Sequence, residues 1–246
     1  MLHGKTALVT GGTSGIGFAT ARLFLEHGAR VAITGRDRGR LVEAQHQLGD
    51  GVVALQADVR SRGELHKMAA TLADAFGSLD IVFANSGVAF ATPIETTDEA
   101  ACDELMNVNF KGVFFTVQAV LPLLRPGGSI VLNTSWLNQV GTPGRSLLSA
   151  SKAAVRSLAR TLSAELLDRR IRVNAVSPGS IETPIHRRGQ SDAEFRAYKE
   201  RVAAQVPAGR MGQPDDIAAA ALFLASDASS YMLGAEIVVD GGRAEL

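Results

Sequence analysis

The stretch KTALVTGGTSGIG, residues 5–17, decides how this chain folds. It begins as a short apolar run and continues with glycines at Gly11, Gly15 and Gly17. The apolar run predicts a buried strand, and the residues after the glycines predict a helix. Glycines at this spacing let the chain turn tightly, approach a pyrophosphate with its backbone and pack the helix against the strand. The stretch therefore predicts a dinucleotide site with the phosphates at the helix N-terminus; a turn without a ligand is the alternative.

The rest of the chain alternates short apolar runs with longer amphipathic ones. The apolar runs predict strands at 5–10, 30–34, 52–58, 80–85, 129–135, 171–178 and 236–242. The other stretches predict helices at about 16–27, up to 48, 62–76, 98–124, 147–168 and 215–225. Apolar strands separated by helices are typical of a parallel sheet covered on both faces. We predict an α/β fold, a single domain over 1–246 with a Rossmann-type, doubly wound parallel sheet of about seven strands and helices on both faces.

Composition and charge exclude several classes of protein. Lysine plus arginine equals aspartate plus glutamate at 25 each, and no basic stripe indicates nucleic acid or a membrane surface. No run reaches the roughly 18 apolar residues of a membrane span, and the N-terminus lacks the pattern of a signal peptide. Cys102 is the only cysteine, so an intrachain disulfide and a thiolate metal cluster are both excluded, and we predict no metal site. These features predict a cytoplasmic protein.

The end of the second predicted strand indicates which dinucleotide binds. An acid there accepts from free ribose hydroxyls, whereas a base faces a 2′-phosphate. Gly35 and Arg36 stand at this point, followed by Arg38, and a guanidinium can face a phosphate with two parallel N–H groups. We predict NADP(H) rather than NAD(H), although Asp37 argues the other way and solvated loop arginines are the alternative. Asp58, ending the third strand, has two interpretations: an acceptor for the adenine amino group, or a helix N-cap.

Several segments, in this order along the chain, resemble the short-chain dehydrogenase/reductase family over essentially the whole length. They are TGGTSGIG (10–17), ANSG (84–87), NVNFKGVFF (107–115), IVLNTS (130–135), SASKAAV (149–155), RVNAVSPGSIETP (172–184) and YMLGAEIVVDGG (231–242). The resemblance implies hydride transfer between the nicotinamide C4 and a carbonyl or alcohol carbon of a small molecule.

The resemblance also implies a role for particular residues. Ser135 would polarise the carbonyl oxygen, Lys152 would bind the nicotinamide ribose, and Asn109 would hold a water that relays protons. The cofactor-binding residues it implies, together with those predicted above, are Gly11, Thr13, Ser14, Gly15, Ile16, Gly17, Arg36, Asp58, Val59, Asn85, Gly87, Lys152, Pro178, Gly179, Ile181 and Thr183.

One position departs from the family pattern. The family's tyrosine acid lies four residues before the lysine, one helical turn away on the same face. Counting back from Lys152 gives Leu148, and counting thirteen residues on from Ser135 gives the same position. The register is therefore fixed twice, and a leucine stands where the proton donor is expected.

Few residues are candidates to take over that role. The chain has two tyrosines, Tyr198 and Tyr231, and only Tyr198 lies in the variable stretch expected over the site. We predict that Leu148, Trp136, Ile185 and His186 line the substrate pocket, with Trp136 as a wall. His186 could donate a proton near neutral pH; a surface histidine is the alternative. The polar stretch 186–205 predicts a mobile lid.

Three hypotheses follow from the leucine. In the first, the chain is a ketoreductase whose tyrosine was lost by drift or by design and whose activity is impaired, since a positioned acid is worth about 10²–10⁴ in rate. It is alternatively an imine-type reductase, whose cationic acceptor needs no proton, or a non-catalytic NADP(H)-binding sensor or partner subunit. The helices predicted at 98–124 and 147–168 are rich in Ala and Leu on more than one face, which favours burial against another subunit. We expect a homo-oligomer, and the resemblance implies a tetramer.

Overall fold

The computed structural model describes residues 1–187 and 190–246, and its centre is a seven-stranded parallel sheet. The strands are β1 (Thr6–Thr10), β2 (Arg30–Gly35), β3 (Val53–Gln56), β4 (Leu79–Ala84), β5 (Leu124–Asn133), β6 (Arg172–Pro178) and β7 (Glu236–Val239). Their order across the sheet is β3-β2-β1-β4-β5-β6-β7, and every neighbouring pair is parallel. The strand order reverses between β1 and β4, which is where a doubly wound sheet leaves a crevice at its carboxyl edge.

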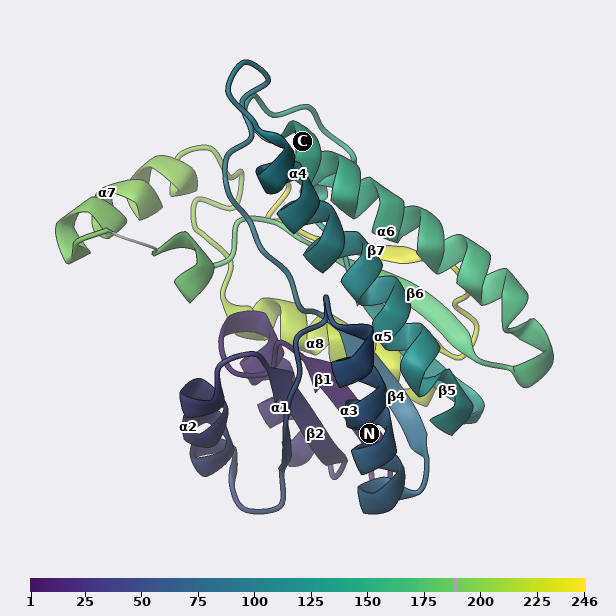
Figure 1. The fold of residues 1–246 in the computed structure, drawn as a ribbon. Coiled ribbons are helices and arrows are strands. Elements are labelled where there is room, and N and C mark those ends of the chain that lie inside the picture. Colours follow the sequence, from purple (N-terminus) through teal and green to yellow (C-terminus); the bar gives the residue numbers. More distant parts are fainter. Residues whose placement is uncertain (188–189) are drawn as a thin grey trace.

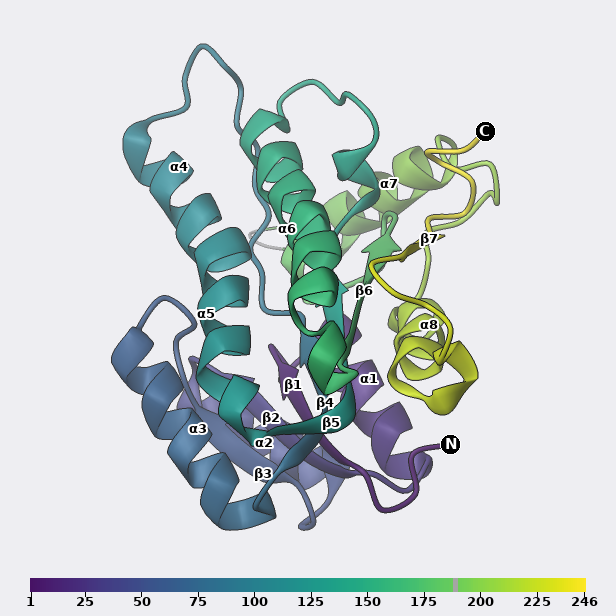
Figure 2. The same cartoon turned by 90° about the vertical axis from the view of Figure 1, so that its right-hand side faces the viewer.

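Helices cover both faces of this sheet (Figures 1 and 2). The α-helices are α1 (Gly15–Glu26), α2 (Arg38–Leu48), α3 (Arg62–Phe76), α4 (Glu99–Met106), α5 (Gly112–Val120), α6 (Ser146–Glu165), α7 (Asp192–Ala203) and α8 (Pro214–Ala225). One apolar cluster packs α3, α5 and α6 against the sheet, and a second packs α1, α2 and α8 against the other face. The predicted α/β class, parallel sheet and two-sided helical cover are thus confirmed.

The chain departs from the predicted elements in several places. The strand predicted at 129–135 starts earlier, because β5 runs over Leu124–Asn133. The helix predicted over 98–124 is interrupted by a wide π-helical turn, Asn107–Lys111, between α4 and α5. The polar stretch predicted as a lid over 186–205 contains α7, which starts with a capping box formed by Ser191 and Glu194; residues 188–189 of that stretch lie outside the described residues. In Figure 1, α7 extends away from the layered body of the molecule.

No helix in the described part of the chain is long and apolar enough to cross a membrane. Within residues 1–187 and 190–246, no three side chains of the metal-binding types gather closely enough to hold an ion. The chain's single cysteine, Cys102 on α4, is a free thiol.

Candidate active site

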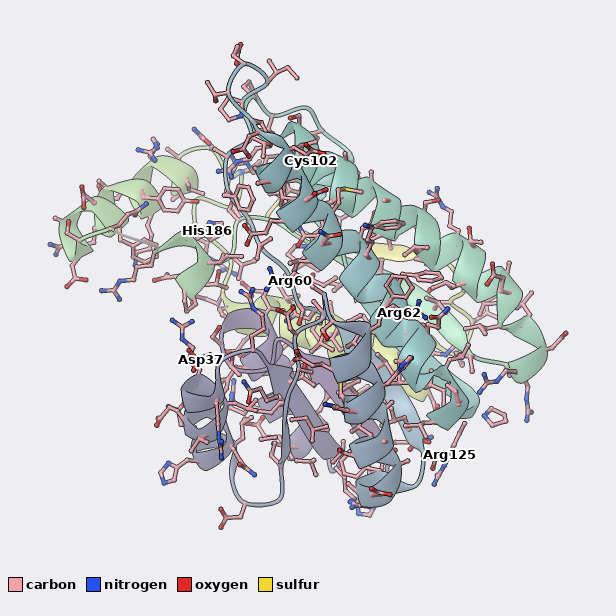
Figure 3. All side chains as sticks on the ribbon, in the orientation of Figure 1. Asp37, Arg60, Arg62, Cys102, Arg125 and His186 are labelled. Atoms are coloured by element: carbon pink, nitrogen blue, oxygen red, sulfur yellow. The ribbon has the colours of Figure 1, made fainter. Side chains whose placement is uncertain are left out.

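A cleft of about 650 Å³ runs along the carboxyl ends of the strands. Among the predicted site residues, twenty line it: Gly11, Thr13, Ser14, Gly15, Ile16, Arg36, Asp58, Val59, Asn85, Gly87, Ser135, Trp136, Leu148, Lys152, Pro178, Gly179, Ile181, Thr183, Ile185 and His186. Figure 3 labels Asp37, Arg60 and His186 around this edge of the sheet and Arg125 at the opposite edge. The volume is in the range of small-molecule and cofactor sites.

The glycine-rich turn forms one end of the cleft. Gly11 and Gly15 have φ angles of 65° and 53°, in the left-handed region that glycine adopts without strain. Gly17 does not line the cleft; a Cβ there would lie 2.2 Å from the Gly11 carbonyl oxygen. Helix α1 therefore approaches β1 at a distance that only glycine permits. This is the backbone cradle that a pyrophosphate requires.

Helix capping explains the ambiguous acid after β2. The Asp37 carboxylate accepts a hydrogen bond from the Arg40 backbone N–H at 2.9 Å and so caps α2. Arg36 and Arg40 both line the cleft here, whereas Arg38 does not. Asp37 is thus engaged in the start of a helix. Arg36 and Arg40 therefore give this end of the cleft, where the adenosine is expected, two cationic side chains.

Asp58 lines the cleft at the end of β3, and one of its two interpretations is wrong. Helix α3 is capped by Ser61, whose side chain accepts from the Glu64 backbone N–H, so Asp58 is no N-cap. The Asp58 carboxylate instead pairs with the Arg60 guanidinium at 2.6 Å. The hydrogen bond from Arg60 is the main reason that the pKa of Asp58 lies below its ordinary value. The side chain stays ionised and keeps acceptor capacity toward the cleft.

A polar chain links the turn to Lys152 across three strand ends. The Lys152 ammonium donates to the Asn133 carbonyl at 2.8 Å, and the Asn133 amide donates to the Asn85 side-chain oxygen at 2.8 Å. Asn85 in turn donates its backbone N–H to the Thr10 hydroxyl, at the end of β1, at 2.9 Å. Burial lowers the pKa of Lys152 to about 8. Sequence reasoning missed Asn133, whose only signal is its place two residues before Ser135.

Ser135 and Leu148 face the same cleft as Lys152. Ser135 follows β5 with extended backbone, and its hydroxyl accepts from the Leu137 backbone N–H at 3.3 Å. Leu148 lies in the first turn of α6, four residues before Lys152, and is only 6% exposed because it belongs to the apolar cluster beneath. Its side chain therefore adds an apolar group to the lining of the cleft that Ser135 and Lys152 also face.

Asn109 lies behind the wall of the cleft. It is fully buried in the π-helical turn, where its amide oxygen accepts from the Val88 N–H at 2.9 Å and its amide nitrogen donates to the Val88 carbonyl at 3.0 Å. It also donates to the Ser151 hydroxyl at 3.3 Å. The side chain therefore ties the loop after β4 to the helical run and to α6.

The far end of the cleft is formed by α7 and the C-terminal segment. The Tyr198 hydroxyl lies 3.3 Å from His186 Nδ1, and both residues line the cleft. His186 is half-buried, and burial, aided by the charge of Arg145, lowers the pKa of its imidazole. The Arg243 guanidinium stacks over the Trp136 ring at 4.3 Å. Sequence reasoning missed four lining arginines, Arg40 and, at this end, Arg145, Arg201 and Arg243, and no local pattern marks the last three.

This fold and cleft define an oxidoreductase of the short-chain dehydrogenase/reductase family, which binds a nicotinamide cofactor. The family model described as enoyl-(acyl carrier protein) reductase matches residues 11–244. The chain therefore belongs to the short-chain dehydrogenase/reductase family, as the sequence resemblance implied.

Several relatives span the same length as this chain. The chain is 42% identical over 247 residues to the oxidoreductase asL5 of Sarocladium schorii, covering 100% of this chain and 98% of that one. It is 37% identical to the 3-oxoacyl-[acyl-carrier-protein] reductase FabG of Thermotoga maritima, covering 98% of each. It is also 37% identical to the NADP-dependent (R)-specific alcohol dehydrogenase of Lentilactobacillus kefiri, covering 98% of this chain and 97% of that one. A short-chain type dehydrogenase/reductase from Mycobacterium marinum superposes with a TM-score of 0.91 at 31% identity, covering 100% and 97%.

The residues present fit a nicotinamide dinucleotide. The close contact between the backbones of Gly11 and Gly17 shapes a turn that can hold phosphates. The residues at and after the end of β6 that line the same cleft are Pro178, Gly179, Ile181 and Thr183. A Cβ on Gly179 would lie 2.5 Å from the Asp240 backbone, so the turn after β6 is held closely against the segment after β7.

Proposed function

We propose that this protein is an NADP(H)-dependent reductase that acts on a carbonyl compound, although it lacks the usual tyrosine acid. The observation that carries the proposal is one cleft that is lined by the glycine-rich turn and by Ser135, Leu148 and Lys152. When bound, the nicotinamide supplies a hydride to the carbonyl carbon. The carbonyl oxygen then needs one proton to become an alcohol.

The choice of NADP(H) is supported by charge at the adenosine end. Arg36 and Arg40 line the cleft where a 2′-phosphate would lie, and Gly35, at the end of β2, carries no side chain that could bind a free ribose. Asp37, which argued for NAD(H), is engaged as the cap of α2. Two guanidinium groups are suited to a phosphate because they offer paired, charge-assisted N–H donors.

We assign the proton to Lys152 in place of a tyrosine. Ser135 donates a hydrogen bond to the substrate oxygen, as the family pattern implies. Burial with no carboxylate beside it makes the Lys152 ammonium a stronger acid than an ordinary lysine, with a pKa of about 8. Asn133 holds the ammonium in place through its carbonyl. Asn109 supports this arrangement from behind by fixing the loop at Val88.

An imine is the second candidate acceptor. It is favoured by the apolar wall that Leu148 places where a hydroxyl is expected, because a cationic imine needs no proton after hydride transfer. A non-catalytic NADP(H)-binding subunit is the third reading, and the assay below separates it from the other two.

Two further proposals concern the surroundings of the cleft. We infer that α7 acts as a lid, since it supplies Tyr198, Arg201 and Val202 to the cleft and is held to the segment after β6 by the Lys199–Glu182 ion pair at 2.8 Å. We also infer a homo-oligomer, a tetramer, that works in the cytoplasm, where a free Cys102 would stay reduced.

The test is NADPH oxidation with ketones and with cyclic imines, for the natural chain and for Leu148→Tyr. The proposal expects ketone reduction in the natural chain and a gain of about 10²–10⁴ when the phenol is restored. Leu147→Tyr, one residue earlier on α6 and outside the cleft, is the matched control and should give no gain. Imine turnover that Leu148→Tyr harms would favour the second candidate. NADPH binding without turnover of either class in either protein would overturn both.

A further inference from the structure

The substrate end of the cleft carries positive charge and no negative charge. Arg145, Arg201 and Arg243 line it together with His186. The two carboxylates that line the cleft, Asp37 and Asp58, lie at the adenosine end and are engaged with Arg40 and Arg60. Across residues 1–187 and 190–246, no carboxylate oxygen lies within 4.0 Å of the three guanidinium groups.

The three arginines surround one pair of side chains. The Arg201 guanidinium packs over the Tyr198 ring at 5.5 Å, and Tyr198 in turn lies beside His186. Arg145 is near enough to His186 to help lower its pKa, after burial. Arg243 lines the same end of the cleft as Tyr198. All three arginines therefore line the cleft together with Tyr198 and His186.

Arg243 is held in place although its charge is not neutralised. Its guanidinium donates to the Ser180 hydroxyl at 2.6 Å and to the Gln205 side-chain oxygen at 2.7 Å, and it stacks on Trp136. Burial is the main reason that its pKa lies below the ordinary value, and the charge of Asp240 opposes this only in part. A half-buried cation fixed by neutral partners is costly unless an anion binds to it.

The cleft also has apolar side chains in its lining. Trp136, Leu137, Leu148, Ile185 and Val202 face the cleft. A ligand that fits both parts has an apolar body that reaches the nicotinamide and an anionic group at the α7 end. A planar guanidinium matches a carboxylate best, since two N–H groups meet its two oxygens.

We propose that the substrate is an oxo-carboxylate whose carboxylate binds Arg243, with Arg145 and Arg201 beside it. The inference rests on the proposed function for the reacting carbonyl: the hydride of NADPH goes to the carbonyl carbon and one proton to its oxygen, while the carboxylate is unchanged. It also counts against a cationic imine, which would meet three arginines.

The test compares benzoylpropionate with its methyl ester, which has the same ketone and no charge. Binding to the NADP⁺ complex is followed through Trp136, the only tryptophan in the chain, which lies under Arg243. We expect the acid to bind about tenfold more tightly than the ester, as for a hydrogen-bonded charge pair. Arg243→Gln should remove this difference by weakening the acid about tenfold and the ester about twofold at most.

Arg30→Gln is the matched control. Like Arg243, Arg30 stacks on an aromatic ring, Phe76 at 4.7 Å, and donates to a neutral acceptor, the Ala75 carbonyl at 3.0 Å, but it lies outside the cleft. It should change neither dissociation constant. If Arg243→Gln fails to fold, Arg201→Gln and Arg145→Gln carry the test, each with a smaller loss for the acid alone.

The outcomes separate this inference from the proposed function. Equal binding of acid and ester by the natural chain, or an acid preference that survives in all three variants, overturns the carboxylate subsite. A preference for the acid without NADPH oxidation of any ketone overturns the reductase and leaves the subsite. Reduction of neutral ketones without preference for the acid overturns the carboxylate subsite and leaves the reductase.

Discussion

Leu148 changes the chemistry required of its neighbour one turn away. In the family pattern a phenol at this position donates the proton and the lysine assists it. Here the side chain is 6% exposed and belongs to the apolar cluster beneath α6, so Lys152 is flanked by hydrocarbon on that side. Desolvation disfavours the charged form of a lysine. The loss of one acid thus leaves an ammonium that releases its proton more readily.

Lys152 should therefore set the upper limit of the pH profile. The ammonium form is the donor, so kcat/KM for carbonyl reduction should fall as the pH rises through about 8. In Leu148→Tyr the phenol becomes the donor, and the fall should move to higher pH. Initial rates between pH 6 and 10 at saturating NADPH measure both profiles. A flat profile in the natural chain up to pH 10 would show that Lys152 is not the acid.

The same side chain gives an independent thermodynamic readout. The pKa of Lys152 is lower in the folded chain than in the unfolded chain, so between about 8 and 10.5 the unfolded chain binds more protons. The free energy of unfolding gains from this residue as the pH rises through that window, and the gain is absent below it. Lys152→Met should remove this rise in urea titrations.

At the scale of elements, the turn between β1 and α1 combines a close backbone approach with a ligand site. Sequence reasoning predicted the turn, its glycines and the elements on either side, because each follows from local pattern. It could not show that Gly17 makes the approach while Gly11 and Gly15 face the cleft. Only the packing of α1 over β1 decides this.

Gly17→Ala should destabilise the chain and weaken cofactor binding. The added methyl would lie 2.2 Å from the Gly11 carbonyl oxygen and 2.6 Å from the Asn85 amide, so backbone must shift, at a cost of about 1–3 kcal/mol. Urea unfolding with and without NADPH measures both effects. Gly63→Ala, on α3 with nothing within 4 Å, is the control and should stabilise slightly, by up to about 1 kcal/mol. An unchanged midpoint for Gly17→Ala would refute the argument.

The helical run before β5 shows why element boundaries were only partly predictable. Its apolar pattern predicted one helix over 98–124, since periodicity does not distinguish an α-turn from a π-turn. The π-helical turn at Asn107–Lys111 brings the Asn109 amide onto both backbone groups of Val88, as a neighbouring strand would. That pairing joins residues 21 positions apart, so it is a tertiary preference that no local pattern contains.

At the scale of the molecule, two exposed apolar residues are candidates for the interface of the proposed oligomer. Tyr231 and Leu233, in the segment before β7, are 101% and 51% exposed, although neither is near the cleft. Exposed apolar side chains that gather at one place favour an interface. They agree with the oligomer expected from the sequence.

Tyr231→Asp should lower the oligomeric state. A buried tyrosine at an interface contributes about 2 kcal/mol or more per site, and a carboxylate there adds a desolvation cost. Light scattering after size exclusion, at several protein concentrations, gives the mass of each variant. Ile94 lies in a loop and is 84% exposed, so Ile94→Asp is the control and should leave the mass unchanged. A natural chain that is monomeric at every concentration would contradict the expected tetramer.

The site was predictable where the family pattern is local, and unpredictable where it depends on convergence. Ser135, Lys152 and Leu148 follow from fixed spacings, and the structure brings them to one cleft. Arg243 and Trp136 are 107 positions apart in the chain, and their contact exists only because β5 and the segment after β7 end at the same edge. The substrate end was therefore missed, together with its charge.

The balance of charge has a kinetic consequence. The whole chain carries equal numbers of cationic and anionic side chains, yet the described lining of the cleft has six of the former and two of the latter. Because the chain as a whole is neutral, the residues outside the cleft carry an excess of negative charge. The molecule is therefore polarised, with its positive side at the cleft. Such a field turns an approaching anion toward the cleft before any contact forms. Salt then slows the capture of a phosphorylated or carboxylated molecule, because the field fades within a Debye length.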